Sequence, residues 1–149
     1  MASDPEGATR DVLVDSNVIL DVLTEDPTWF EWSSSRLAEL AEAATLVLNP
    51  IIYAEISIRF DRIEDLDDAV PADHFRREAL PWEAAFLAGK VFLQYRRRGG
   101  RRRSPLPDFY IGAHAAVHHL RLLTRDARRY RTYFPRLEII APDAAKSGA

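Results

Sequence analysis

Short aliphatic runs recur along this chain, and each is followed within a residue by a polar or acidic side chain. The runs lie at 12–14, 46–48 and, interrupted by Arg121, at 120–123. Runs this short and this apolar favour strands buried on both faces, as in parallel sheets. Stretches of helical period separate them, so the sequence predicts an α/β fold with a mostly parallel central sheet and helices on both faces.

The same patterns give approximate boundaries for the secondary structure. We expect about four strands and, between them, amphipathic helices that begin at capping or proline residues. Residues 63–80 are the least regular stretch, with one short helix and a second, broken one expected. The expected strands are 11–15, 45–49, 120–124 and 137–141, and the expected helices are 16–22, 28–44, 51–60, 63–69, 82–98, 108–118 and 127–134.

Length and composition indicate one intracellular domain. The chain has 149 residues and no cysteine, which suits a single domain without disulfides or thiolate metal sites. We assign the domain to 11–142, with a flexible lead-in at 1–10 and a flexible tail at 143–149. We find no signal peptide and no apolar stretch of the ~20 residues needed to cross a membrane, so we expect a soluble, cytoplasmic protein.

Positive charge is concentrated although the net charge is only -3. A run of arginines interrupted by two glycines occupies 96–103, and further arginines follow between 121 and 136. Such a run is often only a solvated loop. Here it directly precedes a candidate site residue, and arginine binds phosphate in a bidentate manner, so we predict contact with an RNA backbone. The predicted RNA-binding residues are Arg96, Arg97, Arg98, Arg101, Arg102, Arg103 and Arg125.

Four acidic residues stand at the positions that a metal-dependent nuclease would need. Asp15 and Asp126 follow predicted strands, Asp108 begins a predicted helix, and Glu55 lies within one. Carboxylates at the carboxyl ends of parallel strands point into a shared crevice, where they repel one another unless cations lie between them. Mg²⁺ and Mn²⁺ prefer such oxygen ligands, so we predict a divalent-metal site.

Four segments, in this order, resemble the motifs of PIN-domain ribonucleases, and the whole chain resembles the VapC-type toxins of bacterial toxin–antitoxin pairs. The segments are Val-Asp-Ser-Asn-Val-Ile-Leu-Asp at 14–21, Asn-Pro-Ile-Ile-Tyr-Ala-Glu at 49–55, Pro-Asp-Phe-Tyr-Ile-Gly-Ala-His-Ala at 107–115, and Leu-Leu-Thr-Arg-Asp at 122–126 with its continuation to 142.

The resemblance implies a three-layer PIN-like fold and a metal-dependent endoribonuclease that hydrolyses RNA at an acidic Mg²⁺ or Mn²⁺ site. It implies a small antitoxin as partner, an RNA substrate and a homodimer. Asp15, Glu55, Asp108 and Asp126 would be the catalytic, metal-holding residues, with Ser16, Asn17 and Thr124 in support.

Simpler structural roles compete with these assignments. Asp15, Asp108 and Asp126 could each be only a helix cap, and Glu55 only a solvated helix residue. His114 and His118 have the spacing of metal ligands, but the sequence shows no third ligand, so we do not assign zinc there. The aromatic side chains of Trp29, Phe30, Trp32 and Phe60 are expected mainly in the core, with some lining a groove for an antitoxin helix.

Other functions remain open. A phosphoacceptor receiver domain would need a lysine at a strand end, and the chain has lysine only at positions 90 and 146. A phosphatase of the haloacid dehalogenase type would need a second aspartate two residues after Asp15, where Asn17 stands. A PIN-like RNA-processing nuclease that is not a toxin, or a catalytically silent nucleic-acid- or protein-binding domain, are the remaining alternatives.

Overall fold

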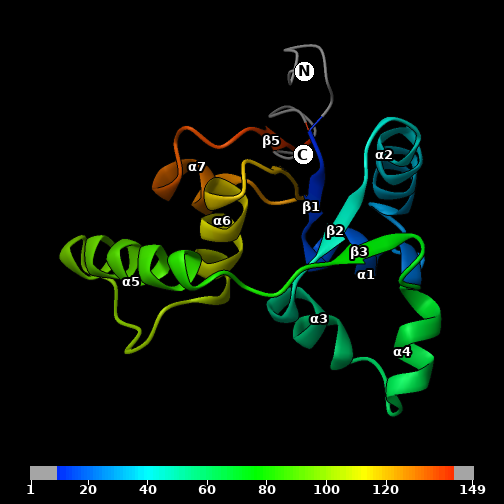
Figure 1. Ribbon diagram of the computed structural model, residues 1–149, viewed down its shortest axis with the longest axis horizontal. Coiled ribbons are helices and arrows are strands. Elements are labelled where there is room, and N and C mark those ends of the chain that lie inside the picture. Colours follow the sequence, from blue (N-terminus) through cyan, green and yellow to red (C-terminus); the bar gives the residue numbers. More distant parts are fainter. Residues whose placement is uncertain (1–9, 143–149) are drawn as a thin grey trace.

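The computed structural model describes residues 10–142 and centres on one sheet of five strands (Figure 1). The strand order is β3-β2-β1-β4-β5, and every neighbouring pair is parallel. The predicted α/β class with a parallel sheet is therefore confirmed, with five strands in place of about four. The strands are β1 Val12–Val14, β2 Leu46–Leu48, β3 Phe75–Arg77, β4 Arg121–Leu123 and β5 Ile139–Ile140.

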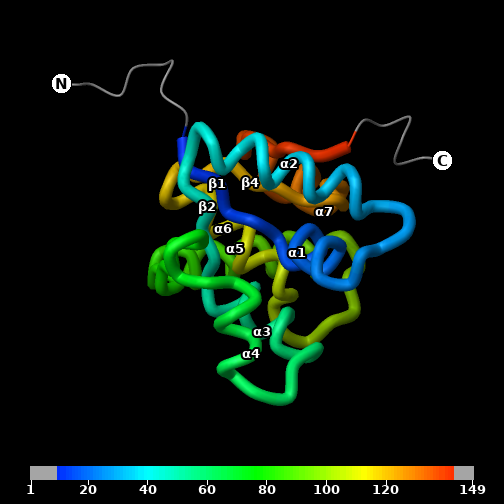
Figure 2. The backbone as a smooth tube through the Cα atoms, turned by 90° about the vertical axis from the view of Figure 1, so that its right-hand side faces the viewer, coloured from blue at the N-terminus to red at the C-terminus, as the bar shows by residue number. Residues whose placement is uncertain are grey.

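Helices cover both faces of the sheet and make the two outer layers of a three-layer fold (Figure 1). α2 lies on one face, and α5 and α6 lie on the other (Figures 1 and 2). The seven helices of the described residues agree with the predicted ones to within a few residues at each end. They are α1 Ser16–Leu23, α2 Phe30–Ala43, α3 Pro50–Ser57, α4 Ile63–Ala69, α5 Trp82–Arg97, α6 Pro107–Val117 and α7 Arg128–Tyr133.

The central strands are apolar because helices exclude water from both sides of them. All three residues of β1 and all three of β2 are buried. In the parallel register, Val12 is paired with both Leu46 and Arg121, so the three central strands end at the same level. The residues that follow them therefore meet at one edge of the sheet.

Strand β3 lies in the stretch where a second, broken helix was expected, so that expectation was wrong. Its residues, Phe75–Arg77, are half-buried or exposed and include two arginines, so they show neither an apolar run nor an alternation. β3 forms because its backbone pairs with β2 at the edge of the sheet, where charged side chains are common. Arg76 then binds Asp11 and Glu78, which a local sequence pattern does not encode.

Two polar residues begin the helices that follow the central strands. Asp15 is the N-cap of α1, and its carboxylate accepts a hydrogen bond from the Ser16 N–H at 2.8 Å. Asn49 is the N-cap of α3, where its side-chain oxygen accepts from the Ile52 N–H and Pro50 occupies the first turn. Both caps therefore lie at the carboxyl edge of the sheet.

The predicted domain limits are only partly covered by the structure. Residues 1–9 of the expected lead-in and the whole expected tail, 143–149, lie outside the described residues. Among the helices of residues 10–142, none combines the length and apolar character that a membrane crossing requires.

Close packing of α6 against the segment after α7 gives a first test of the fold. A Cβ at Gly112 would lie 2.4 Å from the Phe134 ring, whereas a Cβ at Gly89 in α5 would meet nothing within 4 Å. We expect Gly112→Ala to lower the free energy of unfolding by about 1–3 kcal/mol. Gly89→Ala, the matched control, should raise it by up to about 1 kcal/mol through helix propensity. Urea unfolding measures both, and equal effects of the two substitutions would contradict this packing.

Candidate active site

Asp15 lies at the centre of a network of hydrogen bonds at the carboxyl edge of the sheet. Its side chain is 5% exposed. One oxygen accepts from the Ser16 N–H, and the other accepts from the Thr124 hydroxyl and the Tyr130 hydroxyl, each at 2.9 Å. Asp15 is thus both a helix cap and the buried end of the candidate site.

Glu55 and Asp108 approach Asp15 from two helices on the same side. Glu55, in α3, accepts a hydrogen bond from the Ser16 hydroxyl at 2.7 Å. Asp108, in the first turn of α6, accepts from the Tyr130 hydroxyl at 3.3 Å and from the Arg129 guanidinium at 3.2 Å. The hydroxyl of Tyr130 therefore connects Asp15 to Asp108, and Ser16 connects α1 to Glu55.

The loop after β4 supplies Thr124 and Asp126. Thr124 is fully buried, and its hydroxyl accepts hydrogen bonds from the Asn17 side chain and the Asp126 N–H. The Asn17 side-chain oxygen accepts in turn from the Arg125 N–H. Asn17 and Thr124 therefore fix the course of the loop that brings Asp126 to the site.

All four predicted acids line one cavity of about 550 Å³. Ser16 and Asn17 line it as well, and Thr124 lies directly behind Asp15. Arg128, Arg129, Thr132 and Tyr133, all from α7, complete the wall. The structure therefore brings together the acidic and supporting residues that the sequence predicts for the site.

Burial and mutual repulsion make the cluster a poor place for uncompensated negative charge. Burial, followed by the charge of Asp108, raises the pKa of Asp15 to about 6 from its ordinary 3.8. Partial burial and the charge of Asp108 also raise the pKa of Glu55. Burial next to these carboxylates raises the pKa of the Tyr130 hydroxyl well above 10, so Tyr130 remains a hydrogen-bond donor.

The donor set of this cavity suits a divalent metal ion. The lining offers carboxylate oxygens from Asp15, Glu55, Asp108 and Asp126, and no soft sulfur or imidazole ligand. Hard oxygen donors of this kind are those that Mg²⁺ and Mn²⁺ prefer. A cation among them would also remove the repulsion that raises the pKa of Asp15.

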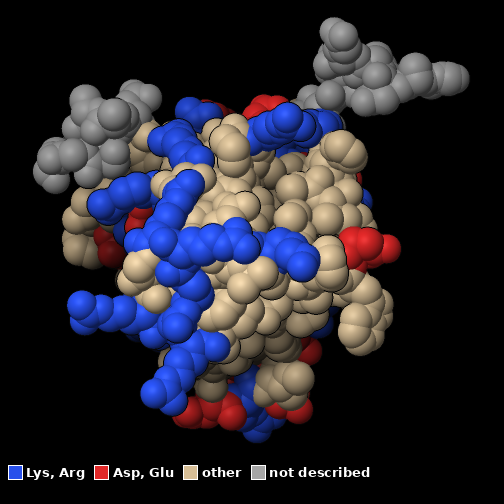
Figure 3. All heavy atoms as spheres, turned by 90° about the vertical axis from the view of Figure 1, so that its left-hand side faces the viewer, with Lys and Arg blue, Asp and Glu red and all other residues tan. Residues whose placement is uncertain are grey.

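The predicted arginines have different environments. Figure 3 shows basic side chains spread over the face where the end of α5 lies. The Arg98 guanidinium lies 5.1 Å from the ring of Tyr133, and the Arg96 guanidinium donates to the Arg102 carbonyl. Arg125 instead donates to both oxygens of buried Asp21, at 2.8 and 2.9 Å, and lies over the Trp29 ring.

Sequence reasoning missed three features around the site. Tyr130 belongs to the segment that resembles the closing motif, and no role was predicted for it, although it bonds to two of the four acids. The α7 arginines 128 and 129 line the cavity but were not assigned to it. A third ligand near His114 and His118 does exist: Glu78, which follows the unpredicted strand β3. Only the first of these had a signal, a tyrosine four residues after Asp126.

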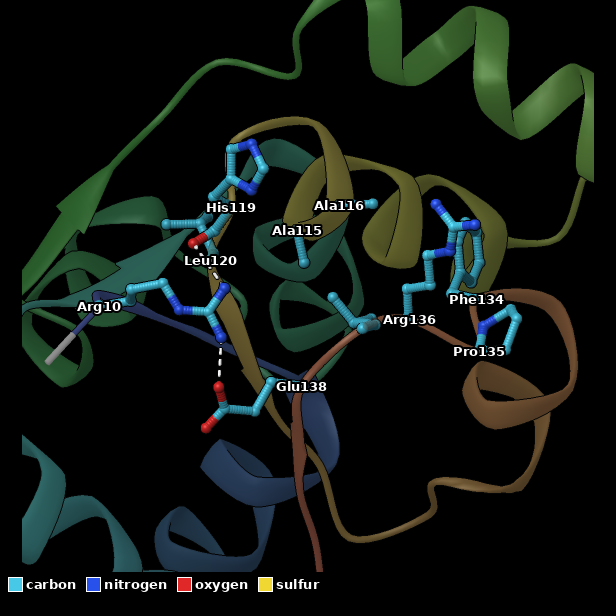
Figure 4. Close-up of a pocket in the computed structure, with 10 residues that line it drawn as sticks. Arg10, Ala115, Ala116, His119, Leu120, Phe134, Pro135, Arg136 and Glu138 are labelled. Carbon is cyan, nitrogen blue, oxygen red and sulfur yellow. Dashed lines mark hydrogen bonds and ion pairs between the residues drawn. The ribbon is translucent and has the colours of Figure 1, made fainter. Parts of the chain in front are cut away.

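A separate cavity of about 450 Å³ lies between the end of α6 and the chain after α7 (Figure 4). Its walls are largely apolar, and at its edge Arg10 binds Glu138 and the His119 carbonyl. The acidic residues of the candidate site do not line it, so it offers no carboxylate cluster for a metal.

Without metal, the free energy of unfolding of the protein should depend on pH through Asp15. Because the folded protein holds this proton more tightly than the unfolded chain, stability falls as pH rises from about 4 to about 6. Ionised Asp15 lowers the free energy of unfolding by about 3 kcal/mol at pH 7. In Asp15→Asn, an amide nitrogen replaces one acceptor oxygen, and the hydrogen bond lost there costs about 1–2 kcal/mol. We expect Asp15→Asn to be about 1 kcal/mol more stable than wild type at pH 7.5 in EDTA, but not at pH 4.

Urea unfolding at the two pH values measures this difference. Asp68→Asn, an exposed aspartate on α4, removes the same charge and is the control. An Asp15→Asn protein that is less stable than wild type at both pH values would contradict the raised pKa.

Comparison with known proteins agrees with this geometry. The family model of the PIN domain matches residues 12–135, and no curated protein matches the chain in sequence. Similar folds occur in VapBC2 from Rickettsia felis bound to a promoter DNA fragment (TM-score 0.69, 16% identity, 89% of this chain and 99% of that one). VapBC-1 from nontypeable Haemophilus influenzae is also similar (TM-score 0.67, 18% identity, 88% of this chain and 97% of that one). So is FitAcB from Neisseria gonorrhoeae (TM-score 0.66, 20% identity, 87% of this chain and 96% of that one).

Proposed function

The chain belongs to the PIN domain family, whose members are nucleases, and on this premise we propose that it is a metal-dependent endoribonuclease that acts as the toxin of a toxin–antitoxin pair. The observation that carries the proposal is the convergence of Asp15, Glu55, Asp108 and Asp126 on one cavity. Packing alone does not require four acids from separate segments to lie together, and their repulsion destabilises the protein when no metal is bound.

The proposed chemistry is hydrolysis of a phosphodiester, in which water adds to phosphorus and the bond to the leaving oxygen breaks. Asp15 and Asp108 would hold the Mg²⁺ or Mn²⁺ ion, and Asp126 would hold a second ion or its waters. When bound, such an ion activates water and stabilises negative charge on the phosphate oxygens. Glu55 would ligate the metal or orient the attacking water, Ser16 holds Glu55, and Thr124 with Asn17 holds the loop of Asp126.

The distribution of positive charge supports RNA as the substrate. The acidic cavity opens beside α7, and basic side chains spread over the neighbouring face (Figure 3). We propose that Arg96, Arg97, Arg98, Arg101, Arg102 and Arg103 bind the RNA backbone. Arg125, with Nε and Nη2 already bound to Asp21, would have fewer N–H groups to offer a phosphate than the other arginines.

The proposed partners are a small antitoxin and a second copy of the chain. The VapBC neighbours are toxin–antitoxin complexes, which supports an antitoxin partner here. Leu23 and Phe30, exposed beside the α1–α2 turn, suit an antitoxin helix, whereas Trp32 and Phe60 pack on the core. Trp82 and Phe86, 89% and 68% exposed one turn apart on α5, suit a homodimer interface.

The alternatives differ in what they require. A non-toxin RNA-processing nuclease would keep the metal-dependent cleavage but would need no antitoxin. A catalytically silent binding domain would bind RNA or protein without cutting, and it gives no reason for the four acids to share a cavity.

Cleavage assays test the catalytic proposal. Purified protein should cut single-stranded RNA with Mn²⁺ or Mg²⁺ and lose this activity in EDTA. Asp108→Asn removes a proposed metal ligand without removing a structural bond of Asp15, so we expect activity to fall on the order of a hundredfold or more. Asp68→Asn should leave the rate unchanged. Equal cleavage by the Asp108→Asn protein would refute the assignment.

The salt dependence of RNA binding tests the arginine surface. Neutralising three phosphate contacts should make the slope of log K against log salt less negative by about 2, at about 0.7 for each contact with a single strand. We therefore expect this change for Arg97, Arg101 and Arg103 together changed to Gln, measured by fluorescence anisotropy in an Asp108→Asn background.

A second triple variant provides the control for charge alone. Arg36, Arg59 and Arg62 lie on α2 and beside α4, away from α5, and their change to Gln alters the net charge equally. A slope that moves as much in this variant, or that stays constant in the first, would remove the loop from the contact surface.

A further inference from the structure

His114 is a fully buried histidine that the proposed chemistry does not use. It lies in α6, and both ring nitrogens are engaged. Nδ1 lies 3.0 Å from the Asn49 side-chain nitrogen, and Nε2 lies 2.9 Å from Oε1 of Glu78. His114 therefore bridges the start of α3 and the residue that follows β3.

The hydrogen bonds of Asn49 decide which nitrogen of His114 carries the proton. The Asn49 side-chain oxygen is occupied as the N-cap acceptor of the Ile52 N–H, so its amide nitrogen faces His114 and donates. Nδ1 of His114 must then accept, and Nε2 carries the hydrogen that it donates to Glu78. This arrangement requires a neutral ring, and burial lowers the pKa of His114 in the same direction.

Glu78 completes this bridge as an acceptor for three side chains. Its Oε1 also accepts from Nδ1 of His118 at 3.0 Å, and its Oε2 accepts from Arg76 at 2.7 Å. These partners and Arg76's charge lower the pKa of Glu78 to about 2 despite its partial burial. Glu78 thus remains an anionic acceptor at neutral pH, and every polar side-chain atom of the bridge has a partner.

The bridge and the acid pair lie at opposite ends of one helix crossing. Asn49 precedes Glu55 by six residues along α3, whereas Asp108 precedes His114 by six residues along α6. Six residues of helix span about 9 Å. α3 and α6 are in contact, and the carboxylates of Glu55 and Asp108 lie close enough for Asp108 to raise the pKa of Glu55. A hydrogen bond between Asn49 and His114 therefore lies at one end of the crossing, and the two like charges of Glu55 and Asp108 lie at the other.

We propose that neutral His114 is a positioning residue, which joins α6 to the start of α3 through Asn49 and to the end of β3 through Glu78, and thereby sets the separation of Glu55 and Asp108. Two like charges on separate helices tend to push those helices apart unless something else holds them. The bridge supplies that restraint from outside the cavity, and its effect on metal binding rests on the function proposed above.

The geometry disfavours a second metal site at the same residues. Ligand atoms of Glu78, His114 and His118 lie within 4.8 Å of one another, which would suit a metal ion. Binding through Nε2 would remove its hydrogen while Nδ1 still accepts from Asn49, which would leave an imidazolate. A metal site would need His118 as much as His114, whereas the positioning role does not need His118, so the two are separable.

Metal affinity and hydrogen exchange test the proposal on the full chain. We expect His114→Leu to weaken Mn²⁺ binding, measured by isothermal titration calorimetry, about tenfold, as loss of outer partners of a metal site does elsewhere. Hydrogen exchange of residues 49–57 should accelerate on the order of tenfold. His114→Gln, which keeps one polar partner, should recover part of both effects. If His114→Leu does not fold, the Mn²⁺ affinity and hydrogen exchange of His114→Gln are compared with those of wild type, and both should change in the same direction by a smaller amount.

Two controls separate positioning from general destabilisation. Ile111→Val loosens the same helix through the core, and His118→Ala removes an exposed partner of Glu78 without touching Asn49 or His114. Both should bind Mn²⁺ within twofold of wild type. Equal weakening by Ile111→Val, or unchanged affinity and exchange in His114→Leu, would overturn the proposal.

The remaining outcomes are also decisive. Tight Zn²⁺ binding by wild type that is lost in both His114→Leu and His118→Ala would replace the positioning role with a metal site. If wild type binds no Mn²⁺, the proposed nuclease site fails, and the exchange of residues 49–57 alone supports or overturns the bridge.

Discussion

Burial of the Asp15 carboxylate is the constraint on which the rest of this structure depends. An ionised carboxyl that is only 5% exposed is expensive, and here other acids lie beside it. Three donors from three segments compensate: the Ser16 N–H, the Thr124 hydroxyl and the Tyr130 hydroxyl. Burial and the charges of Asp108 and Glu55 nevertheless raise the pKa of Asp15, because the hydrogen bonds from Thr124 and Tyr130 lower it by less. A bound cation would compensate the negative charge that these hydrogen bonds leave uncompensated.

The parallel register makes this convergence possible. Three central strands end at one level, so Asp15, Asn49 and Thr124 emerge together although they are far apart in the chain. Asp15 and Asn49 also cap α1 and α3, which carry Ser16, Asn17 and Glu55. The site is therefore built from the edge of the sheet and the helix starts there, and α6 and α7 complete it with Asp108 and Tyr130.

The sequence predicted those parts of the fold and site that local patterns determine. The buried runs at 12–14, 46–48 and 120–123 identified the central strands, and the residues after them identified the edge where Asp15 lies. β3 could not be predicted because Phe75–Arg77 is held by backbone pairing with β2, not by its own pattern. Glu78 was missed for the same reason, and with it the bridge to His114.

Arg125 and Asp21 show a second limit of local patterns. A basic run identifies where positive charge occurs but not which guanidinium already has a buried partner. Asp21 is 2% exposed and also accepts from Ser33. The Arg125–Asp21 pair joins residues that are far apart in the chain, which a local sequence pattern does not encode.

The arrangement of charge around the cavity follows one electrostatic rule. Carboxylates occupy the floor, and arginines of α7 occupy the wall, where Arg129 binds Asp108. That pair is partly exposed, with the Arg129 side chain 49% accessible, so it adds little to stability and opens at small cost. A phosphodiester accompanied by a divalent cation satisfies both halves at once, because the cation neutralises the floor and the phosphate oxygens accept from the wall. The charges of this cavity therefore suit a phosphodiester together with a divalent cation, as the proposed function requires.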